Sequence, residues 1–264
     1  MSEVITSNSN NKIKLVRALQ SRRRNRQSES AFVAEGVRLV EEAVSVLWPM
    51  DYVLYDETLS DRGQALIDQL HANSNVEIAQ ITPKLMREIS DTEAPQGILG
   101  VCKRQVLPLP PKPTFIIIAD QIRDPGNMGT LLRTAEAGGA DAVLLTPGTV
   151  DAFSPKVMRG GMGAHFYLPI HHEDWPEIES YCREIPVFLT TTEGGVPLWE
   201  ANFQQACALL IGGEAFGATQ EGMNLAKNAI TIPMHGRVES LNAAIAAGIV
   251  IAEVLRQRYD QKRE

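Results

Sequence analysis

The second half of the chain alternates short apolar segments with segments of helical periodicity, and this alternation constrains the fold more than any other feature. Uninterrupted apolar runs between turn residues are typical of strands that are buried on both faces. Strand–helix alternation predicts an α/β fold with a mostly parallel sheet, covered by helices on both sides. The expected strands span residues 114–119, 142–145, 166–170, 187–191, 206–211 and 229–233.

The first hundred residues alternate as well, and a proline-rich segment separates them from the rest. Four of the seven residues in 107–113 are proline, which excludes a helix and favours a stiff, extended linker. We therefore expect a small α/β domain over 1–106 and a larger domain over 114–264. In the small domain the expected strands span 31–35, 52–55, 76–81 and 96–103, and the expected helices span 12–20, 36–47 and 61–71, with a fourth beginning after Thr82.

Composition excludes several classes of protein. Hydrophobic residues make up 44% of the chain, but no apolar run is long enough to cross a bilayer, and no signal-peptide pattern is present. Three scattered cysteines (Cys102, Cys182 and Cys207) are typical of a reduced, cytoplasmic protein, although an organelle stays open. His171 and His172 are adjacent and point apart, so we expect two surface imidazoles and no metal site.

Charge is distributed unevenly along the chain. The net charge is −7, yet residues 1–30 carry seven cations against two glutamates. A basic segment on an acidic body indicates a localised contact with nucleic acid, although a solvated charge run at a flexible terminus gives the same pattern. The cations that we expect to contact RNA are Lys12, Lys14, Arg22, Arg23, Arg24 and Arg26.

Three glycine-containing segments follow expected strands, and so end at the same edge of a parallel sheet, where ligands bind. They are 127–133, 211–217 and 232–242. The second lacks the lysine of a phosphate-binding P-loop, and no Gly-x-Gly-x-x-Gly follows the strand at 114–119. Glycines that do not cradle phosphate let bare backbone approach a flat heterocycle.

The three segments together resemble, in order, the three motifs of the SpoU/TrmH family of RNA 2′-O-ribose methyltransferases, in the SPOUT superfamily. The matching patterns are Asn127-x-Gly129-x-x-x-Arg133, Gly213-Glu214-x-x-Gly217 and Ile232-Pro-Met-x-Gly236-x-x-x-Ser240-Leu241-Asn242. The likeness covers about 114–258, and the segment 32–36 (FVAEG) is similar to that family's RNA-substrate-binding domain, which resembles a ribosomal-protein fold. It implies a C-terminal trefoil knot, a homodimer and bound S-adenosylmethionine.

The resemblance also implies a role for individual residues. Arg133 takes the family's catalytic position, with Asn127, Glu214 and Asn242 at the other polar motif positions. The cofactor pocket is expected to include Gly213, Ile232, Met234 and Leu241, bordered by Thr190, Thr191 and Gly194. Arg159 and Ser240 are expected to contact RNA. Two positions depart from the family, since Gly161 and Ala244 stand where serine is common.

The implied reaction is S-adenosylmethionine-dependent 2′-O-methylation of RNA. The N-terminal domain favours ribosomal over transfer RNA, and a non-catalytic RNA-binding or ribosome-assembly factor is the alternative from another class. A guanidinium holds its proton at neutral pH, so we expect Arg133 to bind phosphate and stabilise charge and not to act as a base. Spacing alone favours a surface helix arginine at Arg133 that pairs with Glu136 or Asp124, and Glu214 could be a helix N-terminal acid.

The last helix is expected over 240–258. It is almost wholly apolar between residues 241 and 255, and a helix that is apolar all round is buried in a core or in a subunit interface. Its many small residues favour close packing. This pattern independently predicts a dimer.

Overall fold

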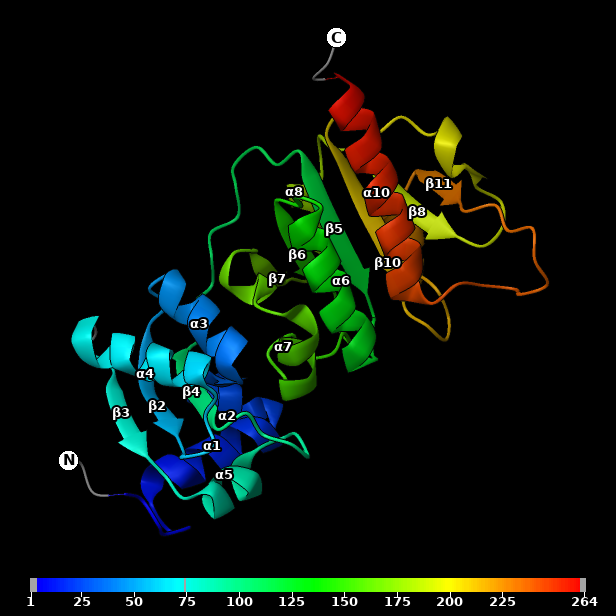
Figure 1. Cartoon of the computed structure of the whole chain (residues 1–264). Helices are drawn as coiled ribbons and strands as arrows, with labels where there is room; N and C mark the ends of the chain where they lie inside the picture. Colours follow the sequence, from blue (N-terminus) through cyan, green and yellow to red (C-terminus); the bar gives the residue numbers. More distant parts are fainter. Residues whose placement is uncertain (1–3, 74, 262–264) are drawn as a thin grey trace. The chain divides into compact units, whose positions relative to one another are not determined.

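The computed structural model describes residues 4–73 and 75–261, which form two compact units (Figure 1). The first unit comprises Met1–Gln105 together with Phe153–Phe166. The second comprises Val106–Ala152 together with Tyr167–Glu264. A short segment from the middle of the chain therefore belongs to the N-terminal unit.

The first unit is built on a four-stranded sheet in which the central strand β4 runs antiparallel to β1 and β2, while β3 pairs parallel with β2 at the edge. These strands follow the expected positions closely. Their bounds are β1 (Ala31–Glu35), β2 (Met50–Tyr55), β3 (Glu77–Gln80) and β4 (Ile98–Lys103).

Helices α1 and α5 of this unit each begin after a capping side chain. The Asn10 side chain accepts a hydrogen bond from Lys12 N at 2.9 Å, and the Thr82 hydroxyl accepts one from Leu85 N at 3.3 Å. Behind these caps, apolar faces pack into one core with the sheet. The helices are α1 (Asn11–Ser21), α2 (Arg23–Ser28), α3 (Val37–Ser45), α4 (Asp61–Asn73), α5 (Pro83–Ile89) and α7 (Pro155–Gly161).

Aromatic packing attaches the middle segment to this unit. The rings of Phe153 and Phe166 lie 5.1 and 6.2 Å from the ring of Phe32, and Trp48 packs edge-on against Phe166. Residues 164–166 form a 3₁₀ turn within this cluster. The expected strand over 166–170 is therefore wrong: pairing begins at Ile170, directly after Pro169, which has no N–H to donate to a sheet.

The second unit contains a seven-stranded sheet in the order β7-β6-β5-β10-β8-β11-β9, and every pair in it is parallel. This confirms the predicted parallel α/β architecture. The strands are β5 (Phe115–Asp120), β6 (Ala142–Leu145), β7 (Ile170–His172), β8 (Val187–Thr191), β9 (Val196–Pro197), β10 (Cys207–Gly212) and β11 (Asn228–Thr231).

Helices cover both faces of this sheet. One face packs against α8 (Trp175–Tyr181) and α9 (Gln220–Leu225). Over the other face, α6 (Pro125–Ala137) and α10 (Ala243–Gln261) lie side by side (Figure 1). A side chain at Gly138 would collide with Ile251, so glycine is what lets the end of α6 approach α10.

The last helix begins later than expected and is buried on one side only. It starts at Ala243 because the Asn242 side chain accepts hydrogen bonds from Ala244 N and Ile245 N, at 3.0 and 3.2 Å. Its opposite side exposes an apolar stripe in the single chain. The stripe consists of Ile245, Ile249, Leu255 and Tyr259.

The proline-rich segment is fastened to the second unit. The carbonyl oxygen of Leu107 lies 2.7 Å from His171 Nε2, and the Tyr181 hydroxyl donates to the Pro110 carbonyl at 2.8 Å. His171 Nδ1 also lies 3.3 Å from Glu173 Oε1. The expectation of a surface imidazole is therefore wrong for His171, whose ring is largely buried and anchors the linker. Among residues 4–73 and 75–261, all helices fall short of the length and apolar character that a membrane span requires.

Candidate active site

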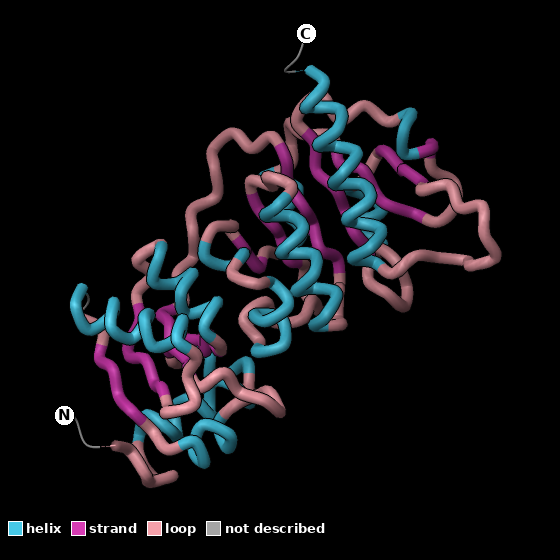
Figure 2. The backbone as a smooth tube through the Cα atoms, viewed as in Figure 1, coloured by secondary structure: helices cyan, strands magenta, loops and turns pink. Residues whose placement is uncertain are grey.

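Three loops leave the sheet of the second unit at one edge. Strands β5, β10 and β11 run parallel, so the residues after Asp120, Gly212 and Thr231 all start from the carboxyl ends. The third loop, residues 232–242, contains no helix or strand before α10 begins (Figure 2). As predicted, the three glycine-containing segments therefore start from the carboxyl edge of the sheet.

Side-chain hydrogen bonds join these loops into one chain. Asn242 Nδ2 donates to Asn127 Oδ1 at 2.8 Å, and Asn127 Nδ2 donates to Glu214 Oε1 at 2.8 Å. One residue from each segment takes part, although the three are far apart in the sequence. Because Asn127 lies in the first turn of α6 and Asn242 caps α10, these hydrogen bonds also connect the N-terminal ends of two helices.

Glu214 receives further hydrogen bonds from the backbone. Its carboxylate accepts from Arg123 N at 3.2 Å and Asp124 N at 3.4 Å, directly before α6. Partial burial alone would raise the pKa of Glu214, but the hydrogen bonds from Asn127 and from these backbone groups outweigh it and lower the pKa. The carboxylate is therefore ionised at neutral pH and acts as an acceptor that holds the loop.

Glycine is required where the loops approach each other. A Cβ atom on Gly213 would lie 2.5 Å from the Gln121 carbonyl oxygen. Gly213 and Gly217 exchange two backbone hydrogen bonds of 3.0 Å, which close a tight turn, and Gly217 has a positive φ of 69°. The second motif is thus a rigid turn pressed against the end of β5.

A cavity of about 700 Å³ lies among the second and third loops and the end of β8, a size typical of small-molecule sites. The hydroxyl of Thr190 is buried in its wall and has no hydrogen-bond partner within the described residues. Gly194 does not line the cavity; it lies in an exposed turn with a positive φ of 76°. The lining residues that the sequence had singled out are Thr190, Thr191, Gly213, Glu214, Ile232, Met234, Ser240, Leu241 and Asn242.

Arg133 is exposed on α6, and its guanidinium makes no hydrogen bond or ion pair with any described residue. It thus pairs with neither Glu136 nor Asp124. A guanidinium without a carboxylate partner is available to bind an external anion. Arg133 does not line the cavity itself, but it shares its helix with Asn127.

Asp120 is a site residue that the sequence reading did not assign. It is fully buried at the end of β5, and its carboxylate accepts from Thr219 N at 2.6 Å, Thr219 Oγ1 at 2.9 Å and Thr146 Oγ1 at 3.0 Å. Thr219 in turn caps α9. Asp120 therefore holds the far end of the second loop. An acid at the end of an otherwise apolar strand is the signal that would have identified it.

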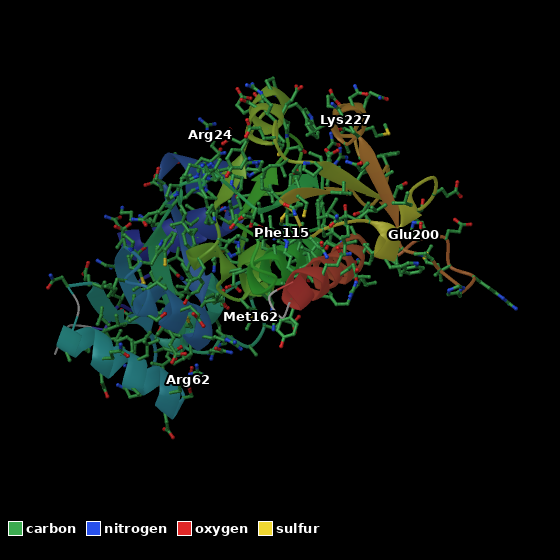
Figure 3. The ribbon with its side chains drawn as sticks, turned by 90° about the horizontal axis from the view of Figure 1, so that it is seen from above. Arg24, Arg62, Phe115, Met162, Glu200 and Lys227 are labelled. Carbon is green, nitrogen blue, oxygen red and sulfur yellow. The ribbon has the colours of Figure 1, made fainter. Side chains whose placement is uncertain are left out.

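The expected RNA-binding cations of the first unit have different environments. Lys14, Arg22, Arg23 and Arg24 are exposed, and Figure 3 shows Arg24 at the outer edge of the first unit. The other three are engaged within the unit: Lys12 pairs with Glu77 at 3.0 Å, Arg159 pairs with Asp91 at 2.5 Å, and Arg26 is buried and donates to the Leu19 carbonyl. The burial of Arg26 contradicts its expected role on an RNA-binding surface.

Comparison with known proteins shows the family to which the chain belongs. Residues 114–252 match the model of the SpoU rRNA methylase family, and residues 10–100 match an MRM3-like substrate-binding domain. The chain belongs to the SpoU rRNA methylase family.

Relatives align over nearly the whole length. The 23S rRNA (guanosine(2553)-2′-O)-methyltransferase RlmP of Bacillus subtilis is 30% identical, covering 94% of this chain and 97% of the relative. An AdoMet-bound rRNA methyltransferase from Sinorhizobium meliloti superimposes with a TM-score of 0.86 at 30% identity, covering 96% and 97% of the two chains. The methyltransferase AviRb from Streptomyces viridochromogenes, with AdoMet, gives 0.85 at 27% identity, covering 95% and 100%.

Packing accounts for one of the two departures from the family pattern. A Cβ atom on Gly161 would lie 2.5 Å from the His165 ring, so serine does not fit there without movement. Ala244 is buried in the first turn of α10, where its N–H is already capped by Asn242. A serine hydroxyl at that position would need a partner of its own.

Proposed function

We propose that this protein transfers a methyl group from S-adenosylmethionine to the 2′-oxygen of a ribose in ribosomal RNA. The observation that carries the proposal is the hydrogen-bonded chain Asn242–Asn127–Glu214. It joins all three motif segments of the family beside one cavity. Membership of a family of rRNA methylases supplies the reaction and the substrate class.

The cavity suits the cofactor chemically. The buried Thr190 hydroxyl needs a partner, the backbone at Gly212 and Gly213 carries no side chains, and Ile232 and Leu241 offer apolar surface. A nucleoside with an amino-acid tail provides both polar edges and apolar faces for such a lining. When bound, S-adenosylmethionine supplies an electrophilic methyl group on its sulfonium.

The chain must make a weak nucleophile react, because a ribose hydroxyl is protonated at neutral pH. The Arg133 guanidinium has no carboxylate partner among residues 4–73 and 75–261, and its planar fork matches a phosphate that flanks the target ribose. Its charge also stabilises the developing alkoxide and so lowers the barrier, while the hydroxyl proton passes to solvent water and not to Arg133. Asn127 and Glu214 fix the N-terminal end of the same helix, so they position Arg133 relative to the cavity.

The first unit binds the RNA through its exposed cations. Lys14 lies on α1, Arg22 lies between the two helices and Arg23 and Arg24 begin α2, all without a counter-ion among the described residues. Such cations bind phosphates without reading sequence. Arg159 and Ser240 are further candidates for RNA contact, since Arg159 is partly exposed and Ser240 lines the cavity.

A second copy of the chain is expected to cover the exposed stripe of α10. Apolar side chains at residues 245, 249, 255 and 259 form one face of that helix, and contiguous exposed apolar surface marks an interface. The trefoil knot and the cytoplasmic location also belong to this proposal. The location is supported by three cysteines that are all buried and unpaired.

Methyl transfer in vitro tests the proposal. Purified protein is incubated with radiolabelled S-adenosylmethionine and with either ribosomal or transfer RNA from cells that lack the gene. We expect label in ribosomal RNA, resistant to alkali at a single dinucleotide, and none with Arg133→Ala. Label in transfer RNA alone would show that transfer RNA is the substrate and ribosomal RNA is not. No label, together with calorimetry that detects no cofactor binding, would favour a non-catalytic RNA-binding protein.

A further inference from the structure

One aromatic side chain at the cavity stands apart from the rest. Phe216 is 89% exposed, although it lines the same cavity as Glu214 and Asn242. Single exposed apolar residues are common on protein surfaces. Phe216 differs in its position, because it lies at the tip of the second motif's turn, beside the residues to which the reaction is assigned.

The turn that carries Phe216 is held in place on both sides. Gly213 and Gly217 close it by two backbone hydrogen bonds of 3.0 Å. Glu214 anchors it to the start of α6, and Asp120 anchors Thr219 beyond it. A ring presented on such a fixed support loses little conformational freedom when a partner packs against it.

The ring's surroundings argue against a role in the cofactor pocket. Thr190 and Ile211 in the cavity wall are partly or fully buried, whereas almost the whole Phe216 side chain faces solvent. An apolar, planar surface at the mouth of a site is suited to another flat group that arrives from solution. Unpaired RNA bases are such groups, because each has a π-face and stacks on aromatic side chains.

We propose that Phe216 is a stacking platform for an unpaired base of the RNA next to the methylated ribose. Stacking there fixes the nucleotide against the cavity, so that the 2′-oxygen is aligned with the methyl donor. The inference rests on the proposed function for its substrate class. It adds the residue that selects an unpaired nucleotide over one held in a helix.

Substitution of the ring separates stacking from simple apolar contact. Phe216→Ala and Phe216→Leu are expected to raise the KM for ribosomal RNA about 5- to 150-fold, while Phe216→Trp keeps it within about threefold. The dissociation constant for S-adenosylmethionine, measured by calorimetry, and the sedimentation coefficient should not change. Trp199→Ala is the matched control, because Trp199 is an exposed aromatic residue that does not line the cavity.

A binding measurement tests the platform independently of catalysis. Unstructured RNA 12-mers carrying one 2-aminopurine are titrated with the full-length wild-type protein and with Phe216→Leu. We expect the wild type to quench the fluorescence by stacking and the leucine variant to quench it far less. An RNA with an abasic site at that position should bind both proteins equally.

Several results would overturn the inference. An unchanged KM in Phe216→Ala or full activity in Phe216→Leu would show that stacking is not needed. Weaker cofactor binding in either variant would place the ring in the cofactor pocket. A changed sedimentation coefficient would place the ring in a subunit interface. If the wild type methylates no RNA, the proposed function fails, and the fluorescence titration still decides whether Phe216 stacks on a base.

Discussion

Replacement of Asp120 by alanine tests how the second loop is held. The carboxylate is fully buried and accepts three hydrogen bonds, two from Thr219 and one from Thr146. The Thr146 hydroxyl can turn toward Thr149, 3.4 Å away, and the Thr219 hydroxyl can also rotate. The Thr219 N–H cannot. One partly buried donor is therefore left unsatisfied in Asp120→Ala, and a small void remains.

The unsatisfied N–H costs about 1–3 kcal/mol, and the lost packing adds on the order of 1 kcal/mol. These costs sum to about 2–4 kcal/mol, and removal of a buried charge recovers part of its desolvation, so we expect a net loss of about 1–3 kcal/mol. That corresponds to a fall of roughly 2–12 °C in the melting temperature of a domain of this size. Since Thr219 ends the loop that lines the cavity, binding of S-adenosylmethionine is expected to weaken by about tenfold or more.

Calorimetry of cofactor binding and thermal melts measure the two effects separately. Asp141→Ala is the matched control, because Asp141 accepts from Thr114 N at 2.5 Å and Phe115 N at 2.8 Å at the opposite end of the same strand. It should lower the melting temperature without changing cofactor affinity beyond about threefold. Unchanged affinity in Asp120→Ala, or equal weakening in both variants, would refute a specific role in holding the loop.

Four further variants probe other parts of the site. Arg133→Lys should abolish most turnover with RNA binding intact, since lysine lacks the planar fork; near-wild-type transfer would contradict this. Glu214→Gln should slow methyl transfer by a factor that is constant from about pH 6 to 9, because the lowered pKa keeps Glu214 of the wild type ionised there. The difference in rate between wild type and variant should shrink in acid. A rate difference that disappears near neutral pH would exclude this account. Substituting Arg22–Arg24 by glutamine should reduce the slope of RNA affinity against salt by about two to three, with an equal slope as the contrary result. Ile249→Glu should convert a dimer to monomers in sedimentation, and an unchanged mass would exclude the α10 stripe as the interface.

The local sequence pattern was sufficient to predict the strands. It was insufficient to predict some of the tertiary contacts that hold elements together. Uninterrupted apolar runs identified β5 and β10 because those strands are buried on both faces. Helix α2 has no apolar residue and was missed; the Arg26 guanidinium ties it to α1 by donating to the Leu19 carbonyl. The attachment of 153–166 depends on ring packing against Phe32, a tertiary contact that no local periodicity encodes.

The site shows the same division. Motif spacing identified Asn127, Glu214 and Asn242. Only the structure shows that Asn242 is hydrogen-bonded to Asn127, and Asn127 to Glu214. Arg26 shows the converse, since a cation in a basic run was expected at the surface and is buried as a structural donor. A charge pattern in the sequence does not show which way each side chain points. It therefore cannot distinguish one buried cation from several exposed ones.

Mapping of ribose methylation in cells tests the central claim most directly. Ribosomal RNA from a strain lacking the gene is compared with RNA from the same strain complemented with the wild type or with Arg133→Ala. The account predicts one 2′-O-methylated nucleotide that is lost in the deletion, restored by the wild type and not restored by Arg133→Ala. Identical methylation in all strains, or restoration by Arg133→Ala, would contradict it.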